Sequence, residues 1–224
     1  MEDAFSTYYG LLRRVHRRLR PRRYLEIGVH KGHSLAFVEA GTTVVGVDPE
    51  PMLERPPPAD TTIVAATSDD FFTNPQYRRL RQDPFDLVFV DGLHLFEQAL
   101  ADILRAEQVC HRDSVILVHD CLPPDAVTAA RERTTVLWSG DVWKAVLALR
   151  SHRPDLRLAV IDAEPTGMGL ITGIEPASAG LPPWYDQVVE ALSPMTFDQL
   201  AAAGRDETLG VVPGRWSSVE PHLP

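Results

Sequence analysis

Short apolar runs, rich in valine and isoleucine and separated by amphipathic segments, constrain the fold of this chain more than any other feature. They lie at residues 24–27, 43–47, 61–65, 85–90 and 114–118. Runs of this length are typical of strands that are buried on both faces of a parallel sheet. Helical spacing of apolar residues follows between them, at residues 33–40, 74–81, 95–109 and 141–152. The alternation predicts a doubly wound α/β sheet with right-handed crossovers and helices on both faces.

Two further strand-like runs end this pattern. Residues 156–162 and 169–174 are joined by a turn around Pro165 and Gly167. So short a connection requires antiparallel strands, because a parallel return needs a dozen or more residues. We therefore expect a mostly parallel sheet with one reversed strand at its end.

The first 22 residues are expected to form an amphipathic helix. Its apolar stripe recurs at spacings of four, three and four residues, at Tyr8, Leu12, Val15 and Leu19, and Pro21 then ends the helix. Residues 1–23 also hold seven arginines against two acidic residues. A basic arm for an anionic ligand or membrane surface is one interpretation, but an apolar stripe favours a packed helix with a solvated arginine face.

Residues 23–175 form the predicted domain, and a proline-rich appendage follows at residues 176–224. The appendage holds seven prolines and two short helical stretches, near 184–192 and 197–204. We expect it to pack on the domain or on a neighbouring copy of the chain. A homo-oligomer is therefore one expected assembly.

Composition excludes several classes of protein. The net charge of −9 argues against nucleic acid as a partner, because an acidic surface repels phosphate backbones. Two irregularly placed cysteines, Cys110 and Cys121, make neither a disulfide framework nor a zinc signature, which indicates a reducing cytoplasm. No apolar run approaches the roughly 18 to 20 residues that cross a bilayer, so we expect no membrane association.

Ligands of open α/β sheets bind outside the carboxyl ends of the strands. The first strand ends in Glu26-Ile-Gly28-Val-His30-Lys-Gly32-His33, where the two glycines allow a tight turn and close approach to bare backbone. A dinucleotide fingerprint needs glycines where His30 and His33 stand. The motif therefore favours a ligand without phosphates and with a cationic end, which Glu26 could face.

The next two strand ends carry polar side chains that suit a nucleoside. Asp48 stands twenty residues after Gly28 at the end of the second strand, where a carboxylate can accept hydrogen bonds from both ribose hydroxyls. The third strand leads into Ser68 and Asp69, followed by two aromatic residues that could cover a purine, Phe71 and Phe72. Each residue alone also suits a cap or a core position. Their order at three consecutive strand ends favours a nucleoside site.

With these motifs the sequence resembles the class I S-adenosylmethionine-dependent methyltransferases over about residues 22–175. The motif Val90-Asp91-Gly-Leu-His94 and the later His119-Asp120 are similar to the subgroup that includes macrocin O-methyltransferase and the cephalosporin-biosynthesis methylation proteins. The resemblance implies a seven-stranded Rossmann-like sheet with the last strand antiparallel. It further implies that the methionine part of the cofactor is surrounded by Glu26, Gly28 and Gly32, the ribose is held by Asp48, and the adenine by Ser68 and Asp69, with Asp91 also at the cofactor.

The fourth and fifth strand ends should bring four ionisable groups together where the methyl group is transferred. They are Asp91, His94, His119 and Asp120. A hydroxyl acceptor needs its proton removed, either by a histidine or through a bound cation. Asp91, His94 and His119 are the candidate catalytic residues. The related metal-dependent enzymes bind magnesium through carboxylates at these strand ends, and here Asp91, His119 and Asp120 would be the ligands for Mg²⁺ or Mn²⁺.

The acceptor pocket is expected near the segment 121–140, which we interpret as a lid. Trp138, Trp143 and Lys144 could line it, with Ser139 or Asp141 capping the following helix. The function predicted is methyl transfer from S-adenosylmethionine to a hydroxyl of a small molecule, such as a sugar or a natural-product scaffold. Alternatives are a cofactor-binding partner subunit without catalysis and a nicotinamide dehydrogenase.

Overall fold

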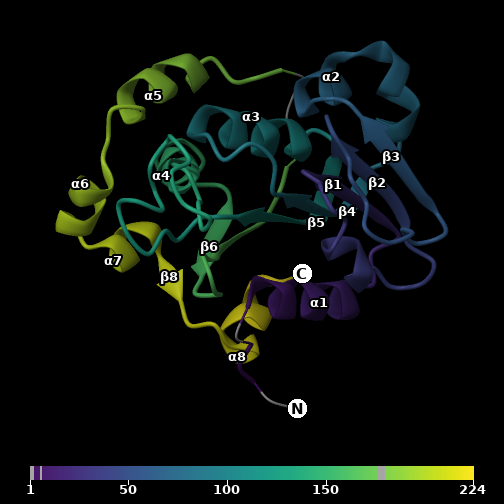
Figure 1. The fold of residues 1–224 in the computed structure, drawn as a ribbon, viewed down its shortest axis with the longest axis horizontal. Coiled ribbons are helices and arrows are strands. Elements are labelled where there is room, and N and C mark those ends of the chain that lie inside the picture. Colours follow the sequence, from purple (N-terminus) through teal and green to yellow (C-terminus); the bar gives the residue numbers. More distant parts are fainter. Residues whose placement is uncertain (1–2, 6, 176–179) are drawn as a thin grey trace.

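The computed structural model describes residues 3–5, 7–175 and 180–224 (Figure 1). Its strands form one sheet in the order β3-β2-β1-β4-β5-β7-β6-β8. Their bounds are β1 Arg23–Ile27, β2 Thr43–Asp48, β3 Thr61–Ala65, β4 Phe85–Val90, β5 Cys110–His119, β6 Arg157–Ile161, β7 Met168–Thr172 and β8 Val211–Val212. The first five pair in parallel, as the apolar runs predicted.

The expectation of seven strands with the reversed strand at the end of the sheet is wrong in two respects. β7 is the antiparallel strand, but it lies between β5 and β6 and pairs with both. The β6–β7 hairpin therefore folds back into the sheet instead of extending it. The eighth strand, β8, comes from the proline-rich region and joins the outer edge of β6 in parallel.

Two hydrophobic cores lie on opposite faces of the sheet, because successive side chains of each strand point to opposite sides. Val88 and Val90 belong to one core, while Leu87 and Phe89, which alternate with them, belong to the other. The first core is covered by helices α2 Ser68–Thr73, α3 Phe96–Glu107, α4 Trp143–His152 and α5 Tyr185–Leu192. The second is covered by α1 Tyr8–Leu19, which lies below the sheet in Figure 1.

The helix α1 follows the expected apolar stripe. Leu12 and Val15 are fully buried, Tyr8 and Leu19 are partly buried, and the helix ends at Arg20 in a left-handed conformation. Two other predicted helices are only 3-10 segments, η1 Ser34–Phe37 and η2 Pro75–Arg81. Both are short. Pro75 has no amide proton, so no α-helix can extend through it from the residues before.

The C-terminal region contains α5, α6 Phe197–Ala202, α7 Arg205–Leu209, α8 Trp216–Val219 and η3 Glu220–His222. In Figure 1, α8 lies beside the N-terminal segment, where Asp3 accepts hydrogen bonds from the backbone amide and the hydroxyl of Ser217. Within the part of the chain that the structure describes, no helix combines the length and apolarity needed to cross a bilayer.

Candidate functional site

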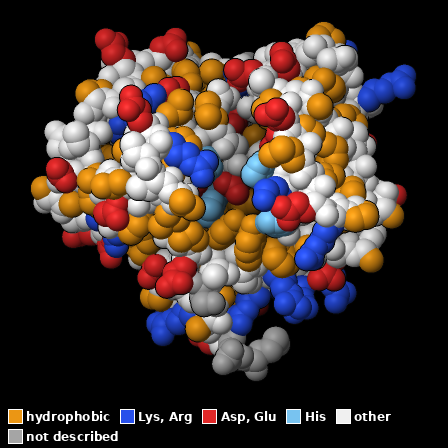
Figure 2. Space-filling view, viewed as in Figure 1, with side chains coloured by type: hydrophobic (Ala, Val, Ile, Leu, Met, Phe, Trp, Pro, Cys, Tyr) orange, Lys and Arg blue, Asp and Glu red, His pale blue; other side chains and the backbone are white. Residues whose placement is uncertain are grey.

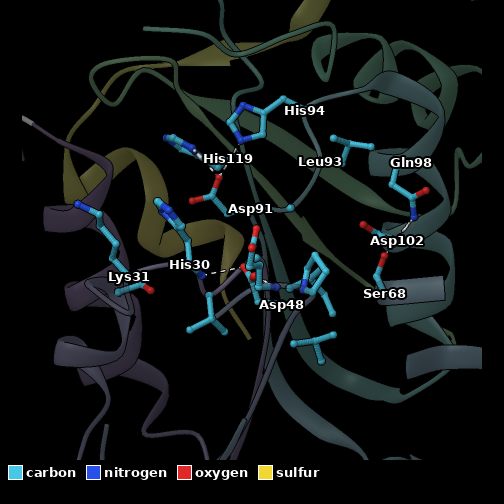
Figure 3. Close-up of a pocket in the computed structure, with 18 of the residues that line it drawn as sticks. His30, Lys31, Asp48, Ser68, Asp91, Leu93, His94, Gln98, Asp102 and His119 are labelled. Carbon is cyan, nitrogen blue, oxygen red and sulfur yellow. Dashed lines mark hydrogen bonds and ion pairs between the residues drawn. The ribbon is translucent and has the colours of Figure 1, made fainter. Parts of the chain in front are cut away.

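A cavity of about 780 Å³ lies at the carboxyl ends of β1, β2, β4 and β5, the edge of the sheet at which the sequence placed a ligand. Figure 2 shows histidine, acidic and basic side chains gathered around this hollow. Figure 3 shows Asp91 at its centre, with Ser68, Gln98 and Asp102 on one side and His30 and Lys31 on the other.

The loop after β1 brings bare backbone against the end of β4. Gly28 has φ +91°, and a Cβ at this position would lie 1.9 Å from the backbone oxygen of Asp91. Gly32 has φ +72°, where a Cβ would lie 2.7 Å from the side chain of Leu53. Gly28 therefore requires glycine for conformation and for space, whereas Gly32 requires it for conformation, because the terminal methyl group of Leu53 can shift. Both glycines line the cavity, as the sequence motif predicted.

Asp48 is buried at the end of β2 and also lines the cavity. Its Oδ2 accepts a hydrogen bond from the backbone amide of His30, and its Oδ1 accepts one from that of Glu50, both at 2.8 Å. His30 itself has a left-handed φ of 43°. The carboxylate thus fixes the glycine loop while keeping lone pairs for a ligand that fills the cavity.

Glu26 does not lie where the sequence placed it. It is fully buried and is not among the residues that line the cavity. The reason is strand alternation: Leu25 and Ile27 point into one core, so Glu26 points to the other, beneath α1. It accepts hydrogen bonds from Tyr24 and from Ser34, and Ser34 lines the cavity. Glu26 can therefore act on a cofactor only through Ser34.

The burial of Glu26 makes folding depend on pH. Burial raises the pKa of Glu26 from 4.5 to about 7, although its two hydroxyl partners lower it. This contribution to stability is complete below pH 4.5 and is lost as the pH rises through about 7. We expect Glu26→Gln to remove a decline on the order of 3 kcal/mol in the free energy of unfolding between pH 4.5 and 8. Melting temperatures at several pH values, with exposed Glu132→Gln as control, would test this. A variant that declines as the wild type does would contradict it.

The far side of the cavity carries a network of polar side chains. The side-chain amide of Gln98 donates to Ser68, Asp69 and Asp102 at 3.0 to 3.2 Å, and Asp69 is also paired with Arg105. Burial raises the pKa of Asp102 to about 6. Ser68 and Asp69 line the cavity as predicted, whereas Gln98 and Asp102 were not anticipated.

Phe71 and Phe72 do not cover this end of the cavity. The two residues belong to α2, and their rings are buried in the first core, between the sheet and the helices that cover it. The turn of helix explains the difference: Thr67 caps α2 by accepting from the amide of Asp70, so the aromatic side chains rotate inward.

The four ionisable groups at the ends of β4 and β5 do converge. Asp91 Oδ1 lies 3.1 Å from Nδ1 of His119 and 3.6 Å from Nε2 of His94. Asp120 Oδ2 lies 3.0 Å from Nδ1 of His94 and 3.4 Å from Nδ1 of His119. Asp120 adopts a left-handed φ of 65°, which turns its side chain back toward the cluster.

The hydrogen bonds of His119 and the raised pKa of both histidines indicate that each imidazole carries a proton on both ring nitrogens. His119 Nδ1 donates to Asp91, and its Nε2 faces Oγ1 of Thr166, whose only proton goes to Asp120 at 2.5 Å. Burial alone would lower the pKa of His119, but Asp91 and Asp120 outweigh it and raise the pKa to about 10. Asp120 and Asp91 likewise raise the pKa of His94 to about 10 against burial. Both values lie well above the ordinary pKa of 6.5 for histidine.

The same cluster offers a set of metal ligands. One ligand atom from each of Asp91, His94 and Asp120 lies within 4.8 Å of the others. Asp120 Oδ2 is buried and accepts no hydrogen bond, because His94 Nδ1 is directed at the backbone oxygen of Trp138, 3.0 Å away. The set differs from the predicted one, since His94 takes the place of His119. Two carboxylates and one imidazole suit Mn²⁺ better than Mg²⁺.

Thr166, from the β6–β7 turn, holds the end of β5 in place. It is buried, its hydroxyl donates to Asp120, and its backbone oxygen accepts from the amide of Leu122 at 2.7 Å. The hydroxyl oxygen of Thr166 also lies 3.4 Å from Nε2 of His119. One residue thereby positions both members of the His119-Asp120 pair, and no local sequence signal pointed to it.

We expect Thr166→Val to lower kcat about tenfold with little change in cofactor affinity, because the lost hydroxyl orients groups that act in the transition state. The variant also leaves His119 Nε2 without an acceptor, which lowers the pKa of His119. The ascending limb of the pH–rate profile should then move to lower pH, and Thr166→Ser should restore it. Thr172→Val, which removes a hydroxyl bound to the backbone of His222, is the matched control. An unshifted profile would exclude this positioning role.

Segments far from the strand ends complete the cavity wall. Tyr8 and Tyr9 enter from α1, and Arg133 and Trp138 enter from the segment 121–140. The Tyr8 ring lies 3.9 Å from that of His119, centroid to centroid. These contacts depend on long-range packing. For that reason, Trp138 was the one residue of the four that the sequence predicted to line a pocket.

Trp143 and Lys144 do not line this cavity. Both are buried, and Lys144 is paired with Asp141 at 3.0 Å. Neither Ser139 nor Asp141 caps α4: the hydroxyl of Ser139 donates to the backbone of Thr128, and Asp141 accepts from the first amide of α3, that of Phe96. Their side chains tie the segment 121–140 to the domain.

Comparisons with known proteins agree with this geometry. Residues 25–121 match the family model described as a methyltransferase domain. No curated protein matches the chain. Among solved structures, the O-methyltransferase TomG from Streptomyces achromogenes, in complex with S-adenosylmethionine, is 20% identical with a TM-score of 0.59, covering 75% of this chain and 80% of that one. An O-methyltransferase from Bacillus cereus is 15% identical with a TM-score of 0.56, covering 78% and 83%.

A methyltransferase from Podospora anserina is 15% identical with a TM-score of 0.55, covering 75% of this chain and 78% of that one. At this identity the three structures establish the α/β Rossmann-like methyltransferase fold. With the matched domain, they confirm the expected methyltransferase at the level of fold. The macrocin and cephalosporin subgroup stays a prediction.

Proposed function

We propose, from the methyltransferase domain that this chain carries over residues 25–121, that it transfers the methyl group of S-adenosylmethionine to a hydroxyl of a small molecule. A sugar or a natural-product scaffold is the acceptor we favour. The observation that carries the proposal is that one cavity is lined by the glycine loop, by Asp48, and by Asp91, His94 and His119 together.

The cavity wall divides into parts that suit the parts of the cofactor. Bare backbone at Gly28 and Gly32 suits the methionine moiety, the buried carboxylate of Asp48 suits the ribose hydroxyls, and the Ser68, Asp69 and Gln98 network suits the adenine. Carboxylates also complement the positive sulfonium. In Figure 3, Asp91 lies between Asp48 and the pair His94 and His119, and we assign the histidine side to the acceptor.

Methyl transfer is an in-line displacement in which the acceptor oxygen bonds to the methyl carbon as the carbon–sulfur bond breaks. The hydroxyl proton must leave. Asp91 can accept it or hold the oxygen in line, and His94 or His119 can accept it only after losing the extra proton of its own imidazolium. A divalent cation, if bound by Asp91, His94 and Asp120, would supply a lowered pKa for the acceptor hydroxyl. Its binding requires His94 to lose a proton, so affinity should fall at low pH.

Melting temperatures measured with S-adenosylhomocysteine and with nicotinamide dinucleotides separate this proposal from a dehydrogenase. We expect a rise with S-adenosylhomocysteine alone, because a ligand that binds only the folded state stabilises it. His30 and His33 stand where a pyrophosphate would need glycine. A rise with NAD alone would overturn the proposal. Binding of S-adenosylmethionine without transfer to any acceptor in a broad screen would favour the noncatalytic partner subunit.

A further inference from the structure

Charged side chains of both signs line the cavity. The carboxylates are Asp48, Glu50, Asp69, Asp91 and Asp102. The cations are His94 and His119, which are paired with Asp91 and Asp120, and two basic side chains, Lys31 and Arg133. Lys31 is neutralised by Glu54, whose oxygen lies 2.8 Å from its Nζ. Arg133 is therefore the cation to explain.

Arg133 is exposed, and no carboxylate pairs with it among residues 3–5, 7–175 and 180–224. Its guanidinium makes only long hydrogen bonds, at 3.4 to 3.5 Å, to the backbone oxygens of Thr135 and Val136, and it lies 5.9 Å from the Trp138 ring centroid. Arg131, two residues earlier, is by contrast bound by Glu97 and Asp141. The chain satisfies one arginine of this segment and leaves the one in the cavity available.

The segment that carries Arg133 is fixed at both ends. The guanidinium of Arg131 binds Glu97 at 2.6 and 3.0 Å, and the indole of Trp138 donates to the backbone oxygen of Ala130 at 2.6 Å. Arg133 lies between these anchors. These anchors hold the backbone of Arg133 at the cavity, while its exposed side chain stays free to turn toward a ligand.

Trp138 links Arg133 to the reacting groups. Its ring stacks on that of His94 at 5.0 Å, and His94 contacts both Asp91 and Asp120. Trp138 and His94 therefore form a chain of contacts along the cavity wall from Arg133 to Asp91. An acceptor whose hydroxyl lies at Asp91 and whose anionic group lies at Arg133 would run along this wall.

We propose that Arg133 determines acceptor specificity by binding a carboxylate or phosphate group carried by the methyl acceptor. The inference rests on the proposed function, because it assigns the cavity beside the cofactor to an acceptor. A planar guanidinium binds either oxyanion through two parallel hydrogen bonds. The acceptor class is then a small hydroxy acid or a phosphorylated hydroxy compound.

Calorimetric titration of the full chain, saturated with S-adenosylhomocysteine, tests this with benzoate, benzamide and inorganic phosphate as probes. Benzoate and benzamide share size and shape and differ in charge. We expect one of the two anions to bind at least about tenfold more tightly than benzamide. Arg133→Gln should abolish that preference, and Arg133→Lys should keep part of it. Arg55→Gln, an exposed arginine beside a different cavity, should leave it unchanged.

Preference for benzoate identifies a carboxylate acceptor, and preference for phosphate a phosphorylated one. Equal binding of benzamide and the anions, or an Arg133→Gln variant that binds an anion as the wild type does, would overturn the proposal while leaving the methyltransferase assignment intact. Failure of S-adenosylhomocysteine to bind in the first titration would overturn the proposed function itself, and the acceptor inference with it.

Discussion

The Asp91→Asn variant is expected to lose about 10²- to 10⁴-fold in methyl transfer while it still binds S-adenosylhomocysteine. Burial would raise the pKa of Asp91, but His119 outweighs burial and holds it below its usual range, so the residue is an anion. Asparagine keeps the shape and cannot carry the charge. Two imidazolium groups would then face Asp120 alone, and proton transfer from the acceptor would lose its stabilising carboxylate.

Transfer of a labelled methyl group to an acceptor that the wild type methylates measures the effect, and calorimetry measures cofactor binding. The matched control is Asp86→Asn, because Asp86 pairs with His111 at 2.9 Å at the opposite end of the same strand. This control should keep near-normal transfer. If Asp91→Asn also transfers at a near-normal rate, the cluster is not the catalytic centre.

A chelator distinguishes the two ways in which the cluster could remove the proton. Activity that is lost with excess EDTA and restored by Mn²⁺ supports a cation at Asp91, His94 and Asp120. Activity that is indifferent to EDTA leaves a histidine as the base. With the pKa of His94 and of His119 raised to about 10, the rate should then climb into the alkaline range.

Strands β1, β2, β4 and β5 were predictable because each contains a short apolar run whose burial on two faces leaves no polar alternation. The 3-10 segments and the position of β7 were not, since they depend on how the hairpin packs into the sheet. Glu26 shows the limit most clearly. The motif predicted that it faces the cationic end of the ligand, but its position in β1 directs its side chain into the core beneath α1.

The site was predictable where a residue ends a strand and is carried to the sheet edge by the backbone itself. Asp48, Asp91, His119 and Asp120 are of this kind. Thr166 and Gln98 reach the site from a turn and a helix, through contacts that join residues 47 and 30 positions apart. Arg133 reaches the cavity from a long segment whose Trp138 contacts His94, 44 positions away. Such contacts follow from tertiary packing, which a motif does not record.

The Asp48→Ala variant is expected to weaken the binding of S-adenosylmethionine by about 10- to 100-fold, because hydrogen bonds to a charged acceptor are worth roughly 1.5 to 3 kcal/mol each. The structure adds a second cause. Asp48 accepts from the amides of His30 and Glu50, so alanine also loosens the loop that carries Gly28 and Gly32.

Asp48→Asn separates the two causes. Its remaining carbonyl oxygen can still accept from one amide, so the loop keeps part of its support while the charge is lost. Calorimetric dissociation constants for both variants, with exposed Asp83→Ala as control, decide between them. If Asn binds as weakly as Ala, the charge toward the ribose dominates. If Asn binds nearly as the wild type does, loop support dominates. An unchanged dissociation constant for Asp48→Ala would remove Asp48 from the cofactor site and, with it, the ribose end of the proposed cavity.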